Sequence, residues 1–188
     1  MKKIGAITVG QTPRTDLIPE IAPILGDSIE IIQMGGLDGL TKEEIQTMTP
    51  APGDHVLVSR LKDGSSVSFG ESHILPRLEA CMDQLKKDQV SLILFLCTGE
   101  FPDTFQADVI LTSIVSAIHP HRLAVIAPVK EQLPQMQTKW AGCADSVYGL
   151  AASPYDGIEA VAAAARSIPS DADLIVLDCI GYTVEMKE

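Results

Sequence analysis

The sequence lacks several features that whole classes of protein require. No apolar run approaches the roughly 20 residues that a membrane-spanning helix needs, so we expect no membrane partner. Basic residues are few: 14 Lys and Arg stand against 25 Asp and Glu, and the net charge is −11. Because these basic residues are scattered and a nucleic-acid binder needs a basic face, a nucleic-acid partner is excluded as well.

Cysteine is also scarce. The chain has four cysteines, no Cys-x-x-Cys pair, and four histidines that do not stand near the cysteines at metal-ligand spacing. Four cysteines in a chain of this size do not form a disulfide scaffold. We therefore expect neither a zinc site nor any other metal.

A secretion signal is missing too. Residues 1–9 begin with a lysine pair and an apolar stretch, but this stretch is short and is broken at Gly10. The pattern favours a first strand over a signal peptide, and we expect a cytoplasmic protein.

Apolar, β-branched segments with few charges alternate with segments of helical periodicity. Strands are expected at residues 3–9, 28–34, 90–97, 122–129, 145–150 and 173–179, with a further short strand at 108–111. Helices are expected at residues 12–25, 72–87, 114–118, 130–140 and 155–166, with a short one opened by a capping box at Thr41–Glu44. Asp63-Gly64 predicts a hairpin between residues 55–61 and 66–69.

This alternation predicts an α/β protein with parallel sheets and right-handed crossovers. The chain contains two similar αβ half-units, which open with the strands at 3–9 and 122–129. We place the N-terminal subdomain at residues 1–112 and the C-terminal subdomain at residues 113–188. Ligands of such sheets bind beyond the carboxyl ends of the strands, so we expect a cleft between the two subdomains.

The two half-units close with similar segments. In each, an apolar run ends in a cysteine that is followed two residues later by a glycine, at residues 92–99 and 174–181. Two thiols on opposite sides of a substrate carbon suit a two-base proton transfer, which makes Cys97 and Cys179 candidate catalytic residues. The alternative is that both are small residues chosen for tight packing.

The residues that follow each cysteine bear on its reactivity. A free thiol titrates near ~8.5, and a helix N-terminus lowers this value. Thr98-Gly99 and Ile180-Gly181 would each begin such a helix, and their glycines leave N–H groups open to a carboxylate. We therefore count Thr98, Gly99, Ile180 and Gly181 as candidate substrate-binding residues.

The turn after the first strand supplies four more candidates for substrate binding, Gly10, Gln11, Thr12 and Arg14. Thr12 before Pro13 predicts an N-cap with proline in the first helical turn. Arg14, one turn into that helix, would clamp a carboxylate. The alternatives are ordinary capping for Gln11 and Thr12 and a surface position for Arg14.

Two further residues have structural interpretations. Cys81 lies in an apolar stripe at helical spacing and is interpreted as an inert core thiol. Asp178 precedes Cys179 and points to the other side of the strand, so we expect it to orient a neighbouring group or a helix end.

The sequence resembles the AroM family, within the aspartate/glutamate racemase superfamily, over almost its whole length. The resemblance is carried by Ile7–Arg14, Cys97-Thr98, Val125–Val129, Leu133-Pro134-Gln135, Lys139-Trp140 and Leu177–Tyr182. It implies two similar Rossmann- or flavodoxin-like αβ subdomains with a cleft between them, no cofactor, and catalytic thiols at Cys97 and Cys179.

The chain also departs from the amino-acid racemases. They have Cys-Asn-Thr and Cys-Thr-His at the two sites and Asp-Ser after the first strand, where this chain has Cys97-Thr98-Gly99, Cys179-Ile180-Gly181 and Gly10-Gln11. Besides an amino acid, these departures leave open a substrate that bears a carboxylate but no α-amino group. Family members continue past Tyr182 with a helix, a strand and a helix, so we expect a truncated form.

These observations leave two classes of function open. The first is a racemase- or isomerase-like enzyme that uses the two thiols as acid and base on the α-carbon of a small carboxylate, with a thiol-dependent decarboxylase as a variant. The second is a non-catalytic or regulatory protein that binds a carboxylate or phosphate. Both take a small anionic ligand and no cofactor, and a homo-oligomer is left open.

Overall fold

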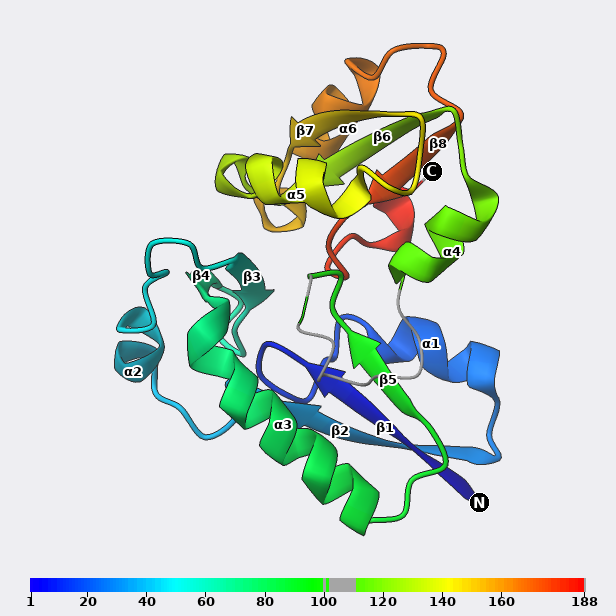
Figure 1. Ribbon diagram of the computed structural model, residues 1–188. Coiled ribbons are helices and arrows are strands. Elements are labelled where there is room, and N and C mark those ends of the chain that lie inside the picture. Colours follow the sequence, from blue (N-terminus) through cyan, green and yellow to red (C-terminus); the bar gives the residue numbers. More distant parts are fainter. Residues whose placement is uncertain (100, 102–110, 188) are drawn as a thin grey trace. The chain divides into compact units, whose positions relative to one another are not determined.

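The computed structural model describes residues 1–99, 101 and 111–187 (Figure 1). These residues form two compact units. The first holds residues 1–97 and Phe101, and the second holds Thr98, Gly99 and residues 111–187. The boundary expected between residues 112 and 113 stays a prediction.

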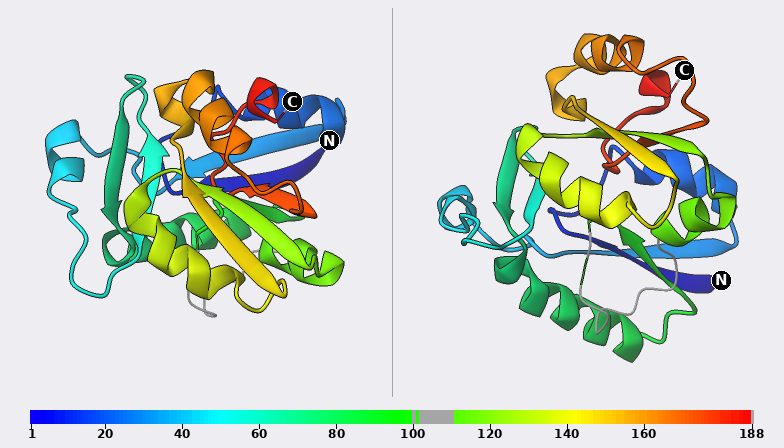
Figure 2. Two further views of the ribbon diagram at one scale, coloured as in Figure 1. Left: turned by 90° about the horizontal axis from the view of Figure 1, so that it is seen from above. Right: turned by 45° about the horizontal axis from the view of Figure 1, so that its top comes forward.

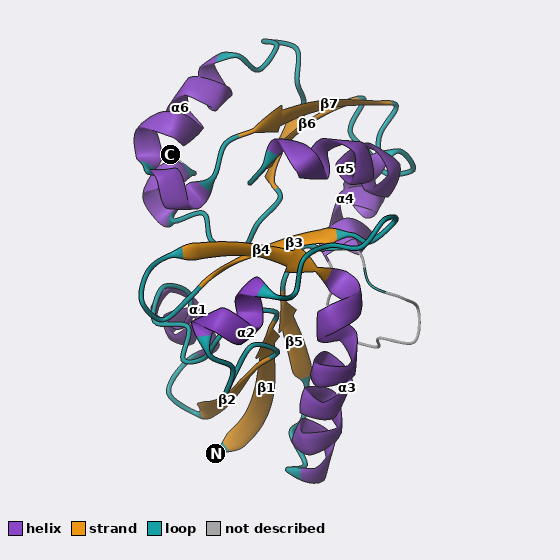
Figure 3. Ribbon diagram, turned by 90° about the vertical axis from the view of Figure 1, so that its left-hand side faces the viewer, coloured by secondary structure: helices purple, strands orange, loops and turns teal. Residues whose placement is uncertain are grey.

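The first unit is built on a parallel three-stranded sheet in the order β2-β1-β5. Its strands are β1 (Lys2–Thr8), β2 (Ile29–Gly35) and β5 (Ile93–Leu96), and its longer helices are α1 (Ile18–Leu25) and α3 (Glu71–Lys87). The two helices lie on opposite faces of the sheet (Figure 3). The central strand β1 is buried from Ile4 onward, because helices cover both of its sides.

The second unit repeats this arrangement with the order β7-β6-β8, again parallel. Its strands are β6 (Arg122–Ala127), β7 (Ser146–Ala151) and β8 (Leu174–Leu177), and its helices are α4 (Leu111–Ile118), α5 (Leu133–Trp140) and α6 (Ile158–Arg166). Short 3-10 turns occupy Lys130–Gln132, Pro154–Asp156 and Val184–Met186. Figure 3 shows α5 and α6 on opposite sides of this sheet, and the Trp140 side chain of α5 is fully buried.

The two sheets therefore share one topology. In each, the first strand in sequence lies in the centre, the second on one side and the third on the other. Cys97 follows β5, the third strand of the first unit's parallel sheet, and Cys179 follows β8, the third strand of the second unit's sheet. The predicted α/β class, the parallel sheets and the similarity of the half-units are confirmed.

A small antiparallel hairpin of β3 (Val56–Arg60) and β4 (Ser66–Gly70) forms a separate sheet in the first unit (Figure 2). Its turn contains Gly64 at φ +84°, a conformation that favours glycine, as the Asp63-Gly64 signal predicts. The short helix α2 (Lys42–Gln46) precedes the hairpin. It opens with the predicted capping box, in which Thr41 accepts from the Glu44 N–H and the Glu44 carboxylate accepts from the Thr41 N–H.

Other predictions were wrong in detail. The helix expected from residue 12 begins at Ile18, because Thr12 does not cap it: its N–H and hydroxyl donate to Asp38 over 2.7 and 2.6 Å. The helix expected at 130–140 begins with a 3-10 turn. The strand expected at 108–111 falls on residues 108–110, outside the described part, and on Leu111, which is helical. In the described part of the chain, no helix has both the length and the apolar character of a membrane span.

Candidate functional site

The thiol of Cys179 lies in a turn that supplies hydrogen-bond donors. The Gly181 N–H donates to its sulfur over 3.5 Å, and the Tyr155 hydroxyl lies 4.0 Å from the same atom. Donors aimed at a sulfur favour its negatively charged form. The expectation that Ile180-Gly181 begins an α-helix is wrong, because the chain turns here and continues only into a 3-10 segment. A backbone N–H donor, that of Gly181, therefore takes the place of the helix terminus.

The turn around Cys179 is fixed from two sides. A Cβ at Gly181 would stand 2.5 Å from the Tyr155 hydroxyl, so only glycine allows this close approach. The buried Tyr182 hydroxyl donates to the carbonyls of Ala152 and Ile126 over 2.6 and 3.2 Å. Burial, together with the charges of Cys179 and Asp178, raises the pKa of Tyr182 well above its ordinary value. Tyr182 thus stays protonated and ties the turn to the end of β6.

Cys97 occupies the matching place after β5. Its side chain is half-buried and packs against the apolar core of the first unit. Thr98 and Gly99 are not helical, and Glu100 and residues 102–110, where a helix would continue, lie outside the described residues. The helix expected after Cys97 thus stays a prediction.

A buried ion pair in the second unit, Lys139–Asp178, includes the residue before Cys179 and contacts the residue after Cys97. The Lys139 ammonium lies 2.6 Å from one oxygen of Asp178, and the Trp140 indole N–H donates to the other over 2.8 Å. The side chains of Lys139 and Asp178 are only 6% and 8% exposed. Lys139 also donates to the carbonyl of Thr98 and lies 4.6 Å from the centre of the Trp140 ring. One lysine thus holds the residue after Cys97 and the residue before Cys179.

The loop after β1 is held by its own polar groups. The Gln11 side chain accepts from the Lys62 N–H over 3.0 Å and donates to the Leu40 carbonyl over 3.4 Å. Any side chain at Gly10 would collide with the Ser59 hydroxyl, which lies where a Cβ would stand. Gly10 and Gln11 therefore hold the loop against the hairpin. Whether these two residues or Thr12 also contact a substrate stays a prediction.

Arg14 lies in this loop and not in a helix. Its side chain is 4% exposed, so the alternative of a surface arginine is wrong. Two of its nitrogens donate to the two carboxylate oxygens of Asp16, each over 2.8 Å, and a third donates to the Thr8 hydroxyl over 2.9 Å. This bidentate pair neutralises much of the Arg14 charge within the protein.

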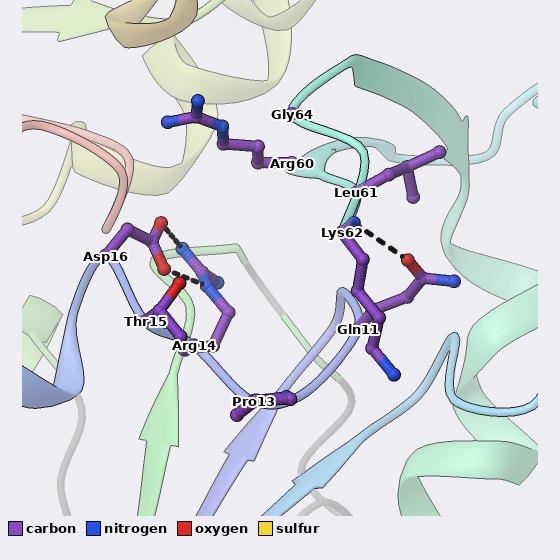
Figure 4. A pocket seen from close by; sticks show the side chains of 9 residues that line it. All are labelled: Gln11, Pro13, Arg14, Thr15, Asp16, Arg60, Leu61, Lys62 and Gly64. Atoms are coloured by element: carbon purple, nitrogen blue, oxygen red, sulfur yellow. Dashed lines mark hydrogen bonds and ion pairs between the residues drawn. The ribbon is translucent and has the colours of Figure 1, made fainter.

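A pocket of about 210 Å³ lies between this loop and the hairpin, entirely within the first unit (Figure 4). Residues 11 and 13–16 line it on the loop side, and residues 60–62 and 64 line it on the hairpin side. Two of the predicted binding residues, Gln11 and Arg14, are thus brought together. Figure 4 shows Arg60 reaching from the hairpin toward the side of the Arg14–Asp16 pair.

The charges around this pocket act on Asp16. Partial burial opposes its ionisation, but the hydrogen bonds and charge of Arg14 and the charge of Arg60 hold the pKa of Asp16 below its ordinary value. Arg60 and Lys62 were missed as candidates, because charged residues on a hairpin usually indicate a solvated surface. The signal that marks Arg60 is its place between Ser59 and Leu61, both of which are buried.

Iodoacetamide at neutral pH is expected to modify Cys179 faster than Cys81. Cys81 is 7% exposed in the core, and burial and the charge of Asp38 raise the pKa of its thiol despite the opposing charge of Arg77. Cys179 is half-buried and has the Gly181 N–H beside its sulfur. Peptide mapping by mass spectrometry over a time course measures both rates. Equal rates, or faster modification of Cys81, would contradict this interpretation of the two thiols.

Residues 4–188 match the family model described as AroM protein. A search of curated proteins and a search of solved structures each found no match. The described residues contain no group of three or more His, Cys, Asp or Glu side chains placed to hold a metal ion. Because the match covers nearly the whole chain, the protein belongs to the AroM family.

Proposed function

We propose that this AroM protein is a racemase- or isomerase-like enzyme of the aspartate/glutamate racemase superfamily, with Cys97 and Cys179 as acid and base. The observation that carries the proposal is the repeated topology. Cys97 and Cys179 follow corresponding strands, β5 and β8, at the carboxyl ends of two sheets of the same order. Ligands of parallel α/β sheets bind at these ends.

In the proposed reaction, one cysteine as thiolate takes the proton from the α-carbon of a small carboxylate. The electron pair of the broken C–H bond moves into the carboxylate, which becomes an enediolate. The thiol of the other cysteine then gives its proton to the opposite face of that carbon, and the carboxylate is restored with inverted configuration. The proposal requires both thiols to reach one substrate carbon, and it needs no external oxidant or cofactor.

The surroundings of Cys179 support a role for its thiolate. The Gly181 N–H and the Tyr155 hydroxyl can both stabilise negative charge on the sulfur. None of the four cysteines, all of which lie in the described part of the chain, forms a disulfide, and we propose a cytoplasmic setting because thiols stay reduced there. The substrate we propose bears a carboxylate and no α-ammonium group.

Exchange of the substrate's α-proton in D₂O tests this function. The protein is incubated with a panel of amino, hydroxy and aryl-substituted acids, and α-deuterium is followed by NMR. At least one acid is expected to exchange, and Cys97→Ser and Cys179→Ser are each expected to slow its racemisation while the core control Cys81→Ala does not. Absence of exchange for every acid, or exchange that survives both serine changes, would contradict the proposal.

A second candidate is a non-catalytic protein that binds a carboxylate or phosphate. The observation that favours it is the pocket of the first unit, which is lined without either Cys97 or Cys179. Ligand binding raises the melting temperature of a folded protein by mass action. Stabilisation by carboxylates that survives both serine changes, with no α-proton exchange, would support this candidate and contradict catalysis.

A further inference from the structure

The pocket of the first unit carries an excess of positive charge in an acidic chain. Three cationic side chains line it, those of Arg14, Arg60 and Lys62, against the single carboxylate of Asp16. Asp16 is engaged by Arg14 in a bidentate pair. The charges of Arg60 and Lys62 are therefore left without a compensating acid in the lining.

These two cations make no hydrogen bond and no ion pair within the described residues. Among the described residues, no hydrogen bond or ion pair joins the Arg60 guanidinium or the Lys62 ammonium to another residue, although the charge of Arg60 acts on Asp16. The nearby acid of the hairpin turn, Asp63, forms an ion pair with Lys42 over 2.9 Å and accepts a hydrogen bond from the Ser65 hydroxyl. Asp63 therefore does not neutralise the pocket.

The backbone that carries the two cations is fixed. Ser59 and Leu61, on either side of Arg60, are 2% and 7% exposed, and strand alternation sends Arg60 away from the core. The Lys62 N–H is bonded to the Gln11 side chain. The planar guanidinium of Arg60 can bind an oxyanion with two parallel hydrogen bonds, and it loses less entropy per hydrogen bond than an ammonium does.

We propose that this pocket is a binding site for a small dianion, a dicarboxylate or a phosphate group, held by Arg60 and Lys62 opposite the Arg14–Asp16 pair. Two uncompensated cations match two negative charges, and the volume of about 210 Å³ suits a small molecule. The net charge of −11 repels anions at long range, so recognition depends on these near contacts. As a substrate site the pocket rests on the proposed function; as a dianion site it does not.

Isothermal titration of the full chain with succinate and with inorganic phosphate tests the inference. Butyrate and succinamide serve as the singly charged and neutral counterparts of succinate. At least one dianion is expected to bind, and butyrate at least 10-fold more weakly. Succinate binding alone identifies a dicarboxylate site and phosphate binding alone a phosphate site. Binding of neither, or equal binding of butyrate and succinate, would overturn the inference.

The variant Arg60→Gln is expected to weaken dianion binding at least 10-fold without changing the melting temperature, since Arg60 is exposed and unpaired. Lys87→Gln is the matched control: it removes one exposed positive charge of the first unit, in the last turn of α3 and outside the pocket lining. Equal weakening by both variants would show that only the overall charge of the protein affects binding, and it would overturn the proposed site.

The same titration with the Cys97→Ser/Cys179→Ser protein separates this inference from the proposed function. Dianion binding is expected to persist in that variant. Persistent binding in a protein without α-proton exchange would leave the site standing and reject only the catalytic proposal. Loss of binding in the double serine variant, with its fold intact, would overturn the site as defined by the first unit's lining.

Discussion

Asp178→Ala is expected to lower the free energy of unfolding of the second unit by roughly 3–5 kcal/mol, the usual cost of breaking a buried ion pair from one side. The change leaves the buried Lys139 ammonium without its carboxylate and the Trp140 N–H without its acceptor. Trp140 is the single tryptophan of the chain and is fully buried, so its fluorescence during urea denaturation reports on this unit.

Three comparisons sharpen this prediction. Asp178→Asn keeps an acceptor for the indole and is expected to cost less than Asp178→Ala. Asp171→Ala, in the exposed Arg122–Asp171 pair, is expected to change stability little. Replacing both Lys139 and Asp178 with apolar residues is expected to cost less than the sum of the single changes, because no charge is left buried. A loss below about 1 kcal/mol for Asp178→Ala would contradict the energetic role assigned to the pair.

The second large effect concerns the two thiols. Cys97→Ser and Cys179→Ser are each expected to lower the rate of racemisation by a factor of about 10²–10⁴, the usual contribution of a positioned acid or base. Serine keeps the shape of cysteine but is a far weaker base. Each thiol would serve one face of the substrate carbon, so each variant is expected to lose α-proton abstraction from a different enantiomer.

Exchange measured separately on the two enantiomers, for both variants, checks this expectation. Cys81→Ala serves as the control, since Cys81 lies in the core of the first unit. Loss of exchange from the same enantiomer in both variants would indicate one catalytic face and contradict the two-base arrangement. Unchanged rates in both would remove the thiols from the reaction altogether.

Local chemistry made much of the fold predictable. The Asp63-Gly64 turn, the capping box at Thr41 and Glu44 and the buried strands are each determined by residues close in sequence. The start of the helix that ends at Leu25 is predicted too early because that prediction also uses only neighbouring residues. Thr12 has the side chain of an N-cap, but its N–H and hydroxyl donate to Asp38, which is distant in sequence. A contact of that range leaves no periodic signal.

The candidate site residues likewise fall into those that the sequence pattern indicates and those that depend on tertiary contacts. Cys97 and Cys179 were found because the repeat itself places them after corresponding strands. The Lys139–Asp178 pair and the approach of Arg60 to the loop after β1 depend on tertiary packing, so spacing could not indicate them. The only local feature that indicates the pocket is the alternation in which Arg60 lies between the buried residues Ser59 and Leu61.

The central claim is that two different thiols handle the proton on the two faces of one carbon. The most direct test starts from a single enantiomer of an exchanging acid in D₂O and follows the first few per cent of reaction by NMR and chiral chromatography. The account predicts that newly formed product of opposite configuration carries deuterium while the remaining starting enantiomer keeps its proton. Product that retains the original proton, or the absence of any inverted product, would contradict it.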